Sequence, residues 1–341
     1  MKKILRKFTA VILSAVMALS LGACTAKTDN VQSENAAAPG NGGSLKVITT
    51  IFASYDFVRQ IAGDKVDLSM LLKPGTEAHS YEPTPQDIIA IQECDVFIYV
   101  GGENDAWIDD ILDSIDTGGI RMVKLLDCVD TKYQEETVEG MDVNTGHEHT
   151  HEDEEHNHAH GEDEHDEWDE HVWTSPANAM SICMALTDVL CEEDPDNESD
   201  YRDSCESYVG QLGELDKYTR DIVENSARKT IIFGDRFPVR YFIEEYGLSY
   251  YAAFPGCSQE NEASAATIAF LIDKVKEEGI PIVFKIELSS GSMAEAIAQD
   301  CGVKVETFYT GHNLSRDMFE AGETYLSLMY HNADVLKEAL N

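Results

Sequence analysis

Short apolar runs alternate along the chain with longer segments in which apolar residues recur every three or four positions. In the first half, four such runs bounded by turn residues predict strands at residues 45–52, 66–72, 95–101 and 121–127. The segments between them, including residues 54–62 and 85–93, carry the helical spacing. Strands that alternate with helices of this length are crossover units, so this half is expected to be an α/β lobe with a mainly parallel sheet.

A second series with the same alternation follows in the last third of the chain. It predicts strands at residues 230–234, 249–254, 281–287 and 304–310. Helices are expected between them at residues 263–278 and 292–300. The predicted fold class is therefore α/β, with two lobes that each contain a mainly parallel four-stranded sheet.

One long helix is predicted between the two series. From residue 197 to 225 the apolar positions follow a helical stripe: Tyr201, Cys205, Tyr208, Leu212, Leu215 and Ile222. Such a helix is about 40 Å long, which is enough to cross both lobes, although periodicity alone also allows it to belong wholly to one of them. The expected organisation is an N-terminal lobe at 45–195, a linking helix at 196–228 and a C-terminal lobe at 229–341.

The first residues have the pattern of a lipoprotein signal peptide. Basic residues precede an apolar stretch at 8–21, which ends in small residues before Cys24. Cleavage of residues 1–23 and acylation of Cys24 are expected to tether the chain to the extracytoplasmic face of the cell membrane, with residues 24–44 as a flexible spacer. The alternative is an ordinary signal peptide with a chance cysteine.

The chain is strongly acidic, which limits the kinds of molecule that it can bind. The formal net charge is -39 at pH 7. Such a charge repels nucleic acid and anionic surfaces and attracts cations.

Histidines are concentrated in one tract. Residues 147–171 hold eight of the eleven histidines, together with twelve acidic residues and no Lys or Arg. With almost nothing apolar to bury, residues 146–170 are expected to be a mobile loop. Imidazole and carboxylate donors suit zinc and its first-row neighbours, so the loop is predicted to collect metal ions. Its expected donors are His147, His149, His151, His156, His158, His160 and His165. The alternative is a solvated acidic loop that happens to contain histidine.

Other potential ligands lie at or just beyond predicted strand ends. His79 occupies a proline-rich loop after the strand at 66–72, and His171 closes the histidine-rich tract before a helix. In the second lobe, Asp235, Glu287 and His312 follow predicted strands. Ligands of α/β sheets bind outside the carboxyl ends of the strands, so these donors are expected to close a four-coordinate metal site between the lobes.

Several segments resemble a known family. AHSYEPTPQD, DVFIYVGGENDAWID, EHVWTSPANA, RYFIEEYGL and YLSLMYHNADVLKEAL are similar in order and spacing to the cluster A-I (TroA-like) solute-binding lipoproteins of ABC importers. The resemblance covers the chain from about Leu45. It implies two α/β lobes joined by a long helix, with a metal ion bound between them and delivered to a membrane permease. The acidic, histidine-rich loop is similar to that of the zinc branch.

The resemblance also implies a ligand set. His79 and His171 fall on the family's first two ligand positions without a gap. The third position counts to Arg236, which cannot ligate, and a shift of one residue puts Asp235 there instead. The loop of the fourth ligand contains His312, whereas Glu287 matches an acid that is commonly not a ligand.

Two classes of function follow. The leading interpretation is a non-enzymatic protein that captures zinc outside the membrane and passes it to an ABC permease. The alternatives are a manganese-binding member of the same family and a surface-anchored metal-dependent hydrolase. A catalytic zinc keeps an open coordination position, whereas a capture site is closed by protein donors.

Overall fold

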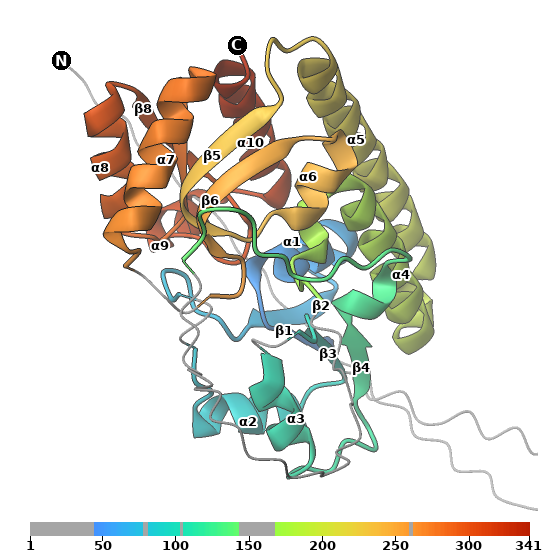
Figure 1. The fold of residues 1–341 in the computed structure, drawn as a ribbon. Coiled ribbons are helices and arrows are strands. Elements are labelled where there is room, and N and C mark those ends of the chain that lie inside the picture. The colour runs from blue at the N-terminus through green and yellow to red at the C-terminus, as the bar shows by residue number, and fades with distance from the viewer. Residues whose placement is uncertain (1–43, 78–80, 103–104, 143–167, 259–261) are drawn as a thin grey trace, which may run out of the picture. The chain divides into compact units, whose positions relative to one another are not determined.

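The computed structural model describes residues 44–77, 81–102, 105–142, 168–258 and 262–341. They form two four-stranded sheets in which every pairing is parallel (Figure 1). The first sheet has the order β2-β1-β3-β4 and the second β6-β5-β7-β8. The prediction of two α/β lobes with parallel four-stranded sheets is confirmed.

The first sheet is buried on both faces. Its strands are β1 (Leu45–Thr49), β2 (Val66–Met70), β3 (Val96–Tyr99) and β4 (Arg121–Lys124). Its helices are α1 (Phe52–Ala62), α2 (Pro85–Gln92), α3 (Ala106–Leu112) and α4 (Pro176–Glu193). Alternate strand residues enter two cores: Val96 and Ile98 pack with α1 and α4, whereas Phe97 packs with α2 and α3. Two buried faces explain why these strands are continuous apolar runs.

The second sheet repeats this arrangement. Its strands are β5 (Thr230–Phe237), β6 (Ser249–Pro255), β7 (Ile282–Ile286) and β8 (Lys304–Phe308). Its helices are α6 (Arg240–Tyr246), α7 (Ala265–Glu278), α8 (Ser292–Cys301) and α10 (Tyr325–Ala339). The short helix α9 (Arg316–Ala321) instead packs Met318 and Phe319 against the core of the first lobe. Phe233 and Phe284 face a core with α6 and α10, and Ile232 and Val283 face one with α7 and α8.

β5 continues to Phe237, beyond the predicted end at residue 234. The pairing of β5 with β6 shifts register between Phe233 and Arg236, so the strand continues past an irregularity. A side chain at Gly234 would begin 2.5 Å from the Cα of Ala294, which shows how closely α8 approaches the strand there.

Helix α5 (Glu198–Glu224) joins the two lobes, as predicted. Its buried stripe from Tyr201 to Leu215 lies in the core of the first lobe, and Val223 near its end lies in the core of the second. Along its length it contacts α4, α1, α10 and α6 (Figure 1). Asp216 on α5 accepts a hydrogen bond of 3.0 Å from the Tyr246 hydroxyl on α6.

Helix α10 makes a second connection between the cores. Its first turns, with Tyr325 and Leu328, pack into the core of the first lobe, and Leu336 lies in that of the second. The fully buried carboxylate of Asp56 on α1 accepts hydrogen bonds from Tyr325 N at 2.6 Å and from Arg59 Nε at 2.8 Å. A carboxylate at a helix N-terminus satisfies a donor that the helix itself leaves unpaired.

No helix among the described residues combines the length and the apolar character needed to cross a membrane.

Replacing Asp56 with Asn should lower the free energy of unfolding by about 2 kcal/mol, because the buried N–H of Tyr325 and the partly buried guanidinium of Arg59 lose an anionic acceptor. Denaturant unfolding followed by circular dichroism measures this. The matched control is Asp64→Asn at an exposed position just after the end of the same helix, which should change stability by less than about 0.5 kcal/mol. Equal stability of the two variants would contradict the assigned role of Asp56.

Candidate metal centre

Three side chains from the two lobes converge on one point. Glu170, His171 and His312 each offer a donor atom, and the three atoms lie within 4.8 Å of one another. All three residues are buried, with exposed fractions of 2%, 0% and 8%. Glu170 and His171 belong to the first lobe and His312 to the loop after β8 of the second, so the donor group forms where the lobes meet.

His171 is oriented by a neighbouring carboxylate. It precedes the short 3-10 helix η4 (Val172–Thr174), and its Nδ1 lies 3.0 Å from Oδ1 of Asp169. The same oxygen accepts a hydrogen bond of 2.9 Å from the backbone N–H of His171. An Nδ1–H that donates to a carboxylate fixes the tautomer in which Nε2 coordinates, an arrangement common among zinc-binding histidines.

The backbone of Asp169 is held from two sides. Its N–H donates to the Tyr133 carbonyl at 2.8 Å, and its carbonyl accepts from the Tyr241 hydroxyl of α6 at 2.8 Å. Burial raises the pKa of the Asp169 carboxyl to about 7, while the hydrogen bond from the His171 N–H acts in the opposite direction. A cation bound to His171 favours the ionised form of the Asp169 carboxylate, and this carboxylate in turn orients the imidazole.

The loop of His312 is held by Glu287. The Glu287 carboxylate accepts from Thr310 N at 2.7 Å and Gly311 N at 3.0 Å, and also from the Thr310 hydroxyl. Burial raises the pKa of Glu287 against the effect of these hydrogen bonds. Gly311 has a φ of +78°, a left-handed conformation that favours glycine. Glu287 therefore supports the loop that presents His312, and the structure does not place it in the donor group.

The His312 loop is also bonded to the first lobe. Phe52 N and Ala53 N, at the start of α1, donate to the carbonyls of His312 and Gly311 at 2.8 and 3.0 Å. No side chain caps this helix, so the loop supplies acceptors for N–H groups that have no partner within the helix. Trp173 Nε1 donates to the Thr310 carbonyl at 2.8 Å.

Aromatic contacts complete the alignment of the two imidazoles. The ring of His312 lies 4.7 Å from that of Trp173 and 4.9 Å from that of His171, with edge-on geometry in both cases. Both histidines are thus fixed relative to one tryptophan. This rigidity pre-organises the donors for an ion.

Glu170 is a donor that the sequence reasoning missed. It belongs to the EHVW motif, yet the sequence alone predicts it to lie in the mobile loop at residues 146–170. Gly102 leaves space for it, since a Cβ there would lie 2.1 Å from Oε2 and 2.4 Å from Cβ of Glu170. The sequence does offer one signal for Glu170: it directly precedes the predicted ligand His171, where the histidine-rich tract rejoins the folded lobe.

The structure also shows where the tract joins the folded lobe. Trp168 pairs with Gln134 in an isolated antiparallel bridge, and Asp169 and Glu170 are buried. Residues 168–170, expected in the loop, therefore belong to the packed lobe. The seven predicted collector histidines lie outside the described residues, as does Cys24.

His79 also lies outside the described residues, within positions 78–80. The residues on either side border the donor group. Tyr81 lines a cavity of about 30 Å³ together with Glu170 and His312, and Glu77 lines one of about 20 Å³ that also contacts His312.

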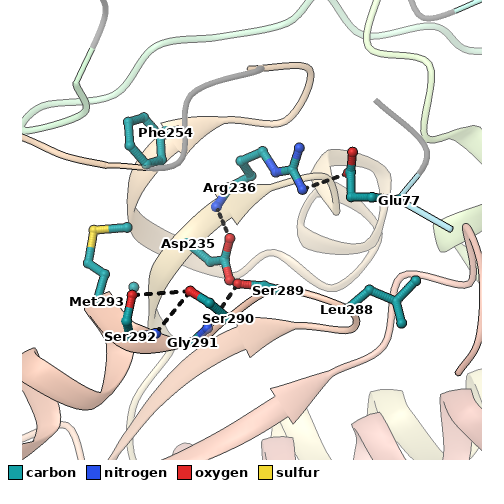
Figure 2. A pocket seen from close by; sticks show the side chains of 11 residues that line it. Glu77, Asp235, Arg236, Phe254, Leu288, Ser289, Ser290, Gly291, Ser292 and Met293 are labelled. Carbon is teal, nitrogen blue, oxygen red and sulfur yellow. Dashed lines mark hydrogen bonds and ion pairs between the residues drawn. The ribbon is translucent and has the colours of Figure 1, made fainter. Parts of the chain in front are cut away.

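Asp235 has a different environment. Its carboxylate accepts from Arg236 N at 2.9 Å and from Ile286 N at 3.3 Å. It lines a cavity of about 180 Å³ beside Ser289 and Ser290, shown in Figure 2. The structure therefore does not bring Asp235 into the donor group.

The donor group fits a zinc ion. A tetrahedral zinc with bonds of about 2.1 Å places its ligands roughly 3.4 Å apart, so donors within 4.8 Å need only small side-chain adjustments. Two imidazoles and one carboxylate leave one position of a four-coordinate site for a further donor.

Comparison with known proteins agrees with this chemistry. Residues 47–339 match the model of the ZnuA family, described as "Zinc-uptake complex component A periplasmic". The chain belongs to the ZnuA family. Membership confirms the resemblance to the cluster A-I solute-binding proteins.

Along almost its whole length the chain is similar to proteins named for zinc uptake or zinc binding. It is 31% identical over 335 residues to the high-affinity zinc uptake system protein ZnuA of Bacillus subtilis, covering 98% of both chains. It is 29% identical to the zinc-binding lipoprotein AdcA of Streptococcus pneumoniae (strain R6), where the match covers 99% of this chain and 61% of the relative.

A solved structure shares the ZnuA-family fold. The Zn(II)-bound ZnuA-like domain of S. pneumoniae AdcA superposes with a TM-score of 0.68 at 27% identity, covering 87% of this chain and 99% of that one. Both lobes therefore have a counterpart in a zinc-bound relative.

Replacing His312 with Ala should lower zinc affinity by more than about 100-fold, because it removes one of the three converging donor atoms, and loss of a residue that only supports a ligand already costs about 10- to 100-fold. Competition titration against a zinc chelator measures the change. Asp235→Asn is the matched control at the other predicted ligand and should stay within about threefold of the parent. An affinity loss for Asp235→Asn as large as that for His312→Ala would contradict the donor group described here.

Proposed function

We propose that this chain is an extracytoplasmic zinc-binding protein, which captures one zinc ion between its lobes and delivers it to an ABC importer. The observation that carries the proposal is the buried convergence of Glu170, His171 and His312 from two lobes. The named relatives are zinc uptake or zinc-binding proteins, which supports zinc as the cargo.

The ligand set that we propose is His171, His312, Glu170 and His79. His79 is the natural fourth donor because Glu77 and Tyr81, on either side of it, line cavities that contact His312. Imidazole nitrogens favour zinc over manganese, which prefers oxygen ligands. This supports the zinc interpretation over the manganese-binding alternative.

A site with four protein donors suits capture rather than catalysis. A hydrolytic zinc keeps a position open for water, whereas three imidazoles with Glu170 fill all four positions. The carboxylate of Asp169 is bonded to His171 and acts as its orienting partner. We therefore infer a transport protein without enzymatic activity, and not a metal-dependent hydrolase.

We propose that the protein is tethered to the membrane and works with a membrane permease. Acylation at Cys24, with residues 24–44 as a spacer, would keep the protein at the extracytoplasmic face of the cell membrane. The partner is the permease of the ABC importer, which receives zinc from the site between the lobes.

The histidine-rich loop is proposed to collect zinc near this site. Its seven histidines and many carboxylates bind ions weakly while the imidazoles are neutral, and its C-terminal end leads directly into Glu170 and His171. Collection in the loop and tight binding between the lobes are then separate tasks.

Deleting residues 146–167 should reduce the number of zinc ions bound per chain and leave one tight site of parental affinity. Calorimetric titration of the parent and the shortened chain with zinc, and then with manganese, tests both the cargo and the division of tasks. Loss of the tight site on deletion would mean that the loop itself supplies ligands of that site. Absence of tight zinc binding in the parent chain would refute the proposed function.

A further inference from the structure

A buried arginine lies beside the proposed cation site. Arg236 occupies the position at which the family resemblance places a third ligand, yet a guanidinium cannot ligate and its charge repels a metal ion. Its side chain is only 7% exposed. It lines the cavity of about 20 Å³ that also contacts His312 and Glu287. The guanidinium therefore needs a role at this position that outweighs its repulsion of a bound metal ion.

The guanidinium joins the two lobes. Its Nη2 lies 2.8 Å from Oε1 of Glu77, which belongs to the first lobe, and its Nη1 donates to the Ser258 carbonyl at 3.3 Å. Figure 2 shows the Arg236 side chain extending from β5 to Glu77. The Glu77 side chain is 35% exposed, so the ion pair lies at the edge of the contact between the lobes.

The segment that ends at Glu77 is also fixed by the loop of His312. Asn313 Nδ2 donates to the carbonyls of Lys73 and Thr76, both at 2.8 Å, and Gly75 N donates to the Leu314 carbonyl at 2.6 Å. These contacts hold residues 73–76. The pair with Arg236 extends the attachment to Glu77, two positions before His79.

The ion pair also borders two cavities. Glu77 and Arg236 line both the cavity of about 180 Å³ beside α8 and the cavity of about 20 Å³ beside His312. The pair therefore borders both the larger cavity and the small space beside His312.

We propose that Arg236 is a positioning residue for zinc binding, which acts through its ion pair with Glu77 to hold the segment before His79 against the second lobe. This inference rests on the proposed function. It assigns Arg236 the task of keeping bound zinc from leaving, although the residue touches no metal.

The direction of the effect distinguishes positioning from simple charge repulsion. If Arg236 only repels the ion, Arg236→Gln removes a cation and tightens zinc binding. If it positions the Glu77 segment, Arg236→Gln weakens binding. We expect Arg236→Gln and Glu77→Gln each to lower zinc affinity about tenfold, mainly through faster release, and the double variant to be no weaker than the worse single variant. Arg236→Lys should restore affinity to within about threefold of the parent.

The experiment combines equilibrium competition with stopped-flow release of zinc into excess chelator. Glu82→Gln is the control for Glu77→Gln, since it removes the same charge from an exposed side chain of the same loop and should leave both values unchanged. Circular dichroism checks the fold of every variant, and Glu77→Gln alone decides the matter if Arg236→Gln does not fold. If the parent binds zinc and the Glu77→Gln variant has the same affinity and release rate as the parent, this inference is overturned while the proposed function stands. A parent without zinc binding would overturn the proposed function with it.

Discussion

The attachment of the His312 loop to the start of α1 is the constraint on which the donor group depends. Two backbone N–H groups of α1, at Phe52 and Ala53, take the carbonyls of His312 and Gly311 as acceptors. A helix that begins without a side-chain cap thus obtains its acceptors from the other lobe. Because the loop is fixed there, the imidazole of His312 lies beside His171 and Trp173. Without this contact, His312 of the second lobe would not be held beside Glu170 and His171 of the first.

The helices that join the lobes limit how such a site opens. Both α5 and α10 bury side chains in the cores of both lobes, so a large hinge rotation would disrupt two continuous helices. Release of the ion is then expected to involve local rearrangement of loops around the donors. Among the described residues, the segment ending at Glu77 lies in such a loop and is held by contacts of Arg236 and Asn313.

Much of this architecture follows from the sequence because it depends on local patterns. Continuous apolar runs predicted strands buried on both faces, and the stripe from Tyr201 to Ile222 predicted the linking helix. β5 was predicted too short because its course past the irregularity at Gly234 and Asp235 depends on pairing with β6 and on contact with α8.

The site was less predictable because its members come from distant parts of the chain. The strand-end rule selected His312 and Asp235 alike, yet the backbone N–H groups of Arg236 and Ile286 use the Asp235 carboxylate. Glu170 was hidden in an acidic tract, and its place in the donor group depends on packing against Gly102, which is distant in the sequence. The pairing of Arg236 with Glu77 joins residues 159 positions apart, which no local pattern reveals.

The central claim is that one buried zinc ion is bound by donors from both lobes. A crystal structure of the zinc-loaded protein, with anomalous diffraction recorded on both sides of the zinc absorption edge, tests it most directly. The account predicts one strong anomalous peak at about 2.0–2.2 Å from His171, His312 and Glu170, with His79 as the fourth ligand. A fully occupied zinc ion elsewhere, with His171 and His312 uncoordinated, would contradict it.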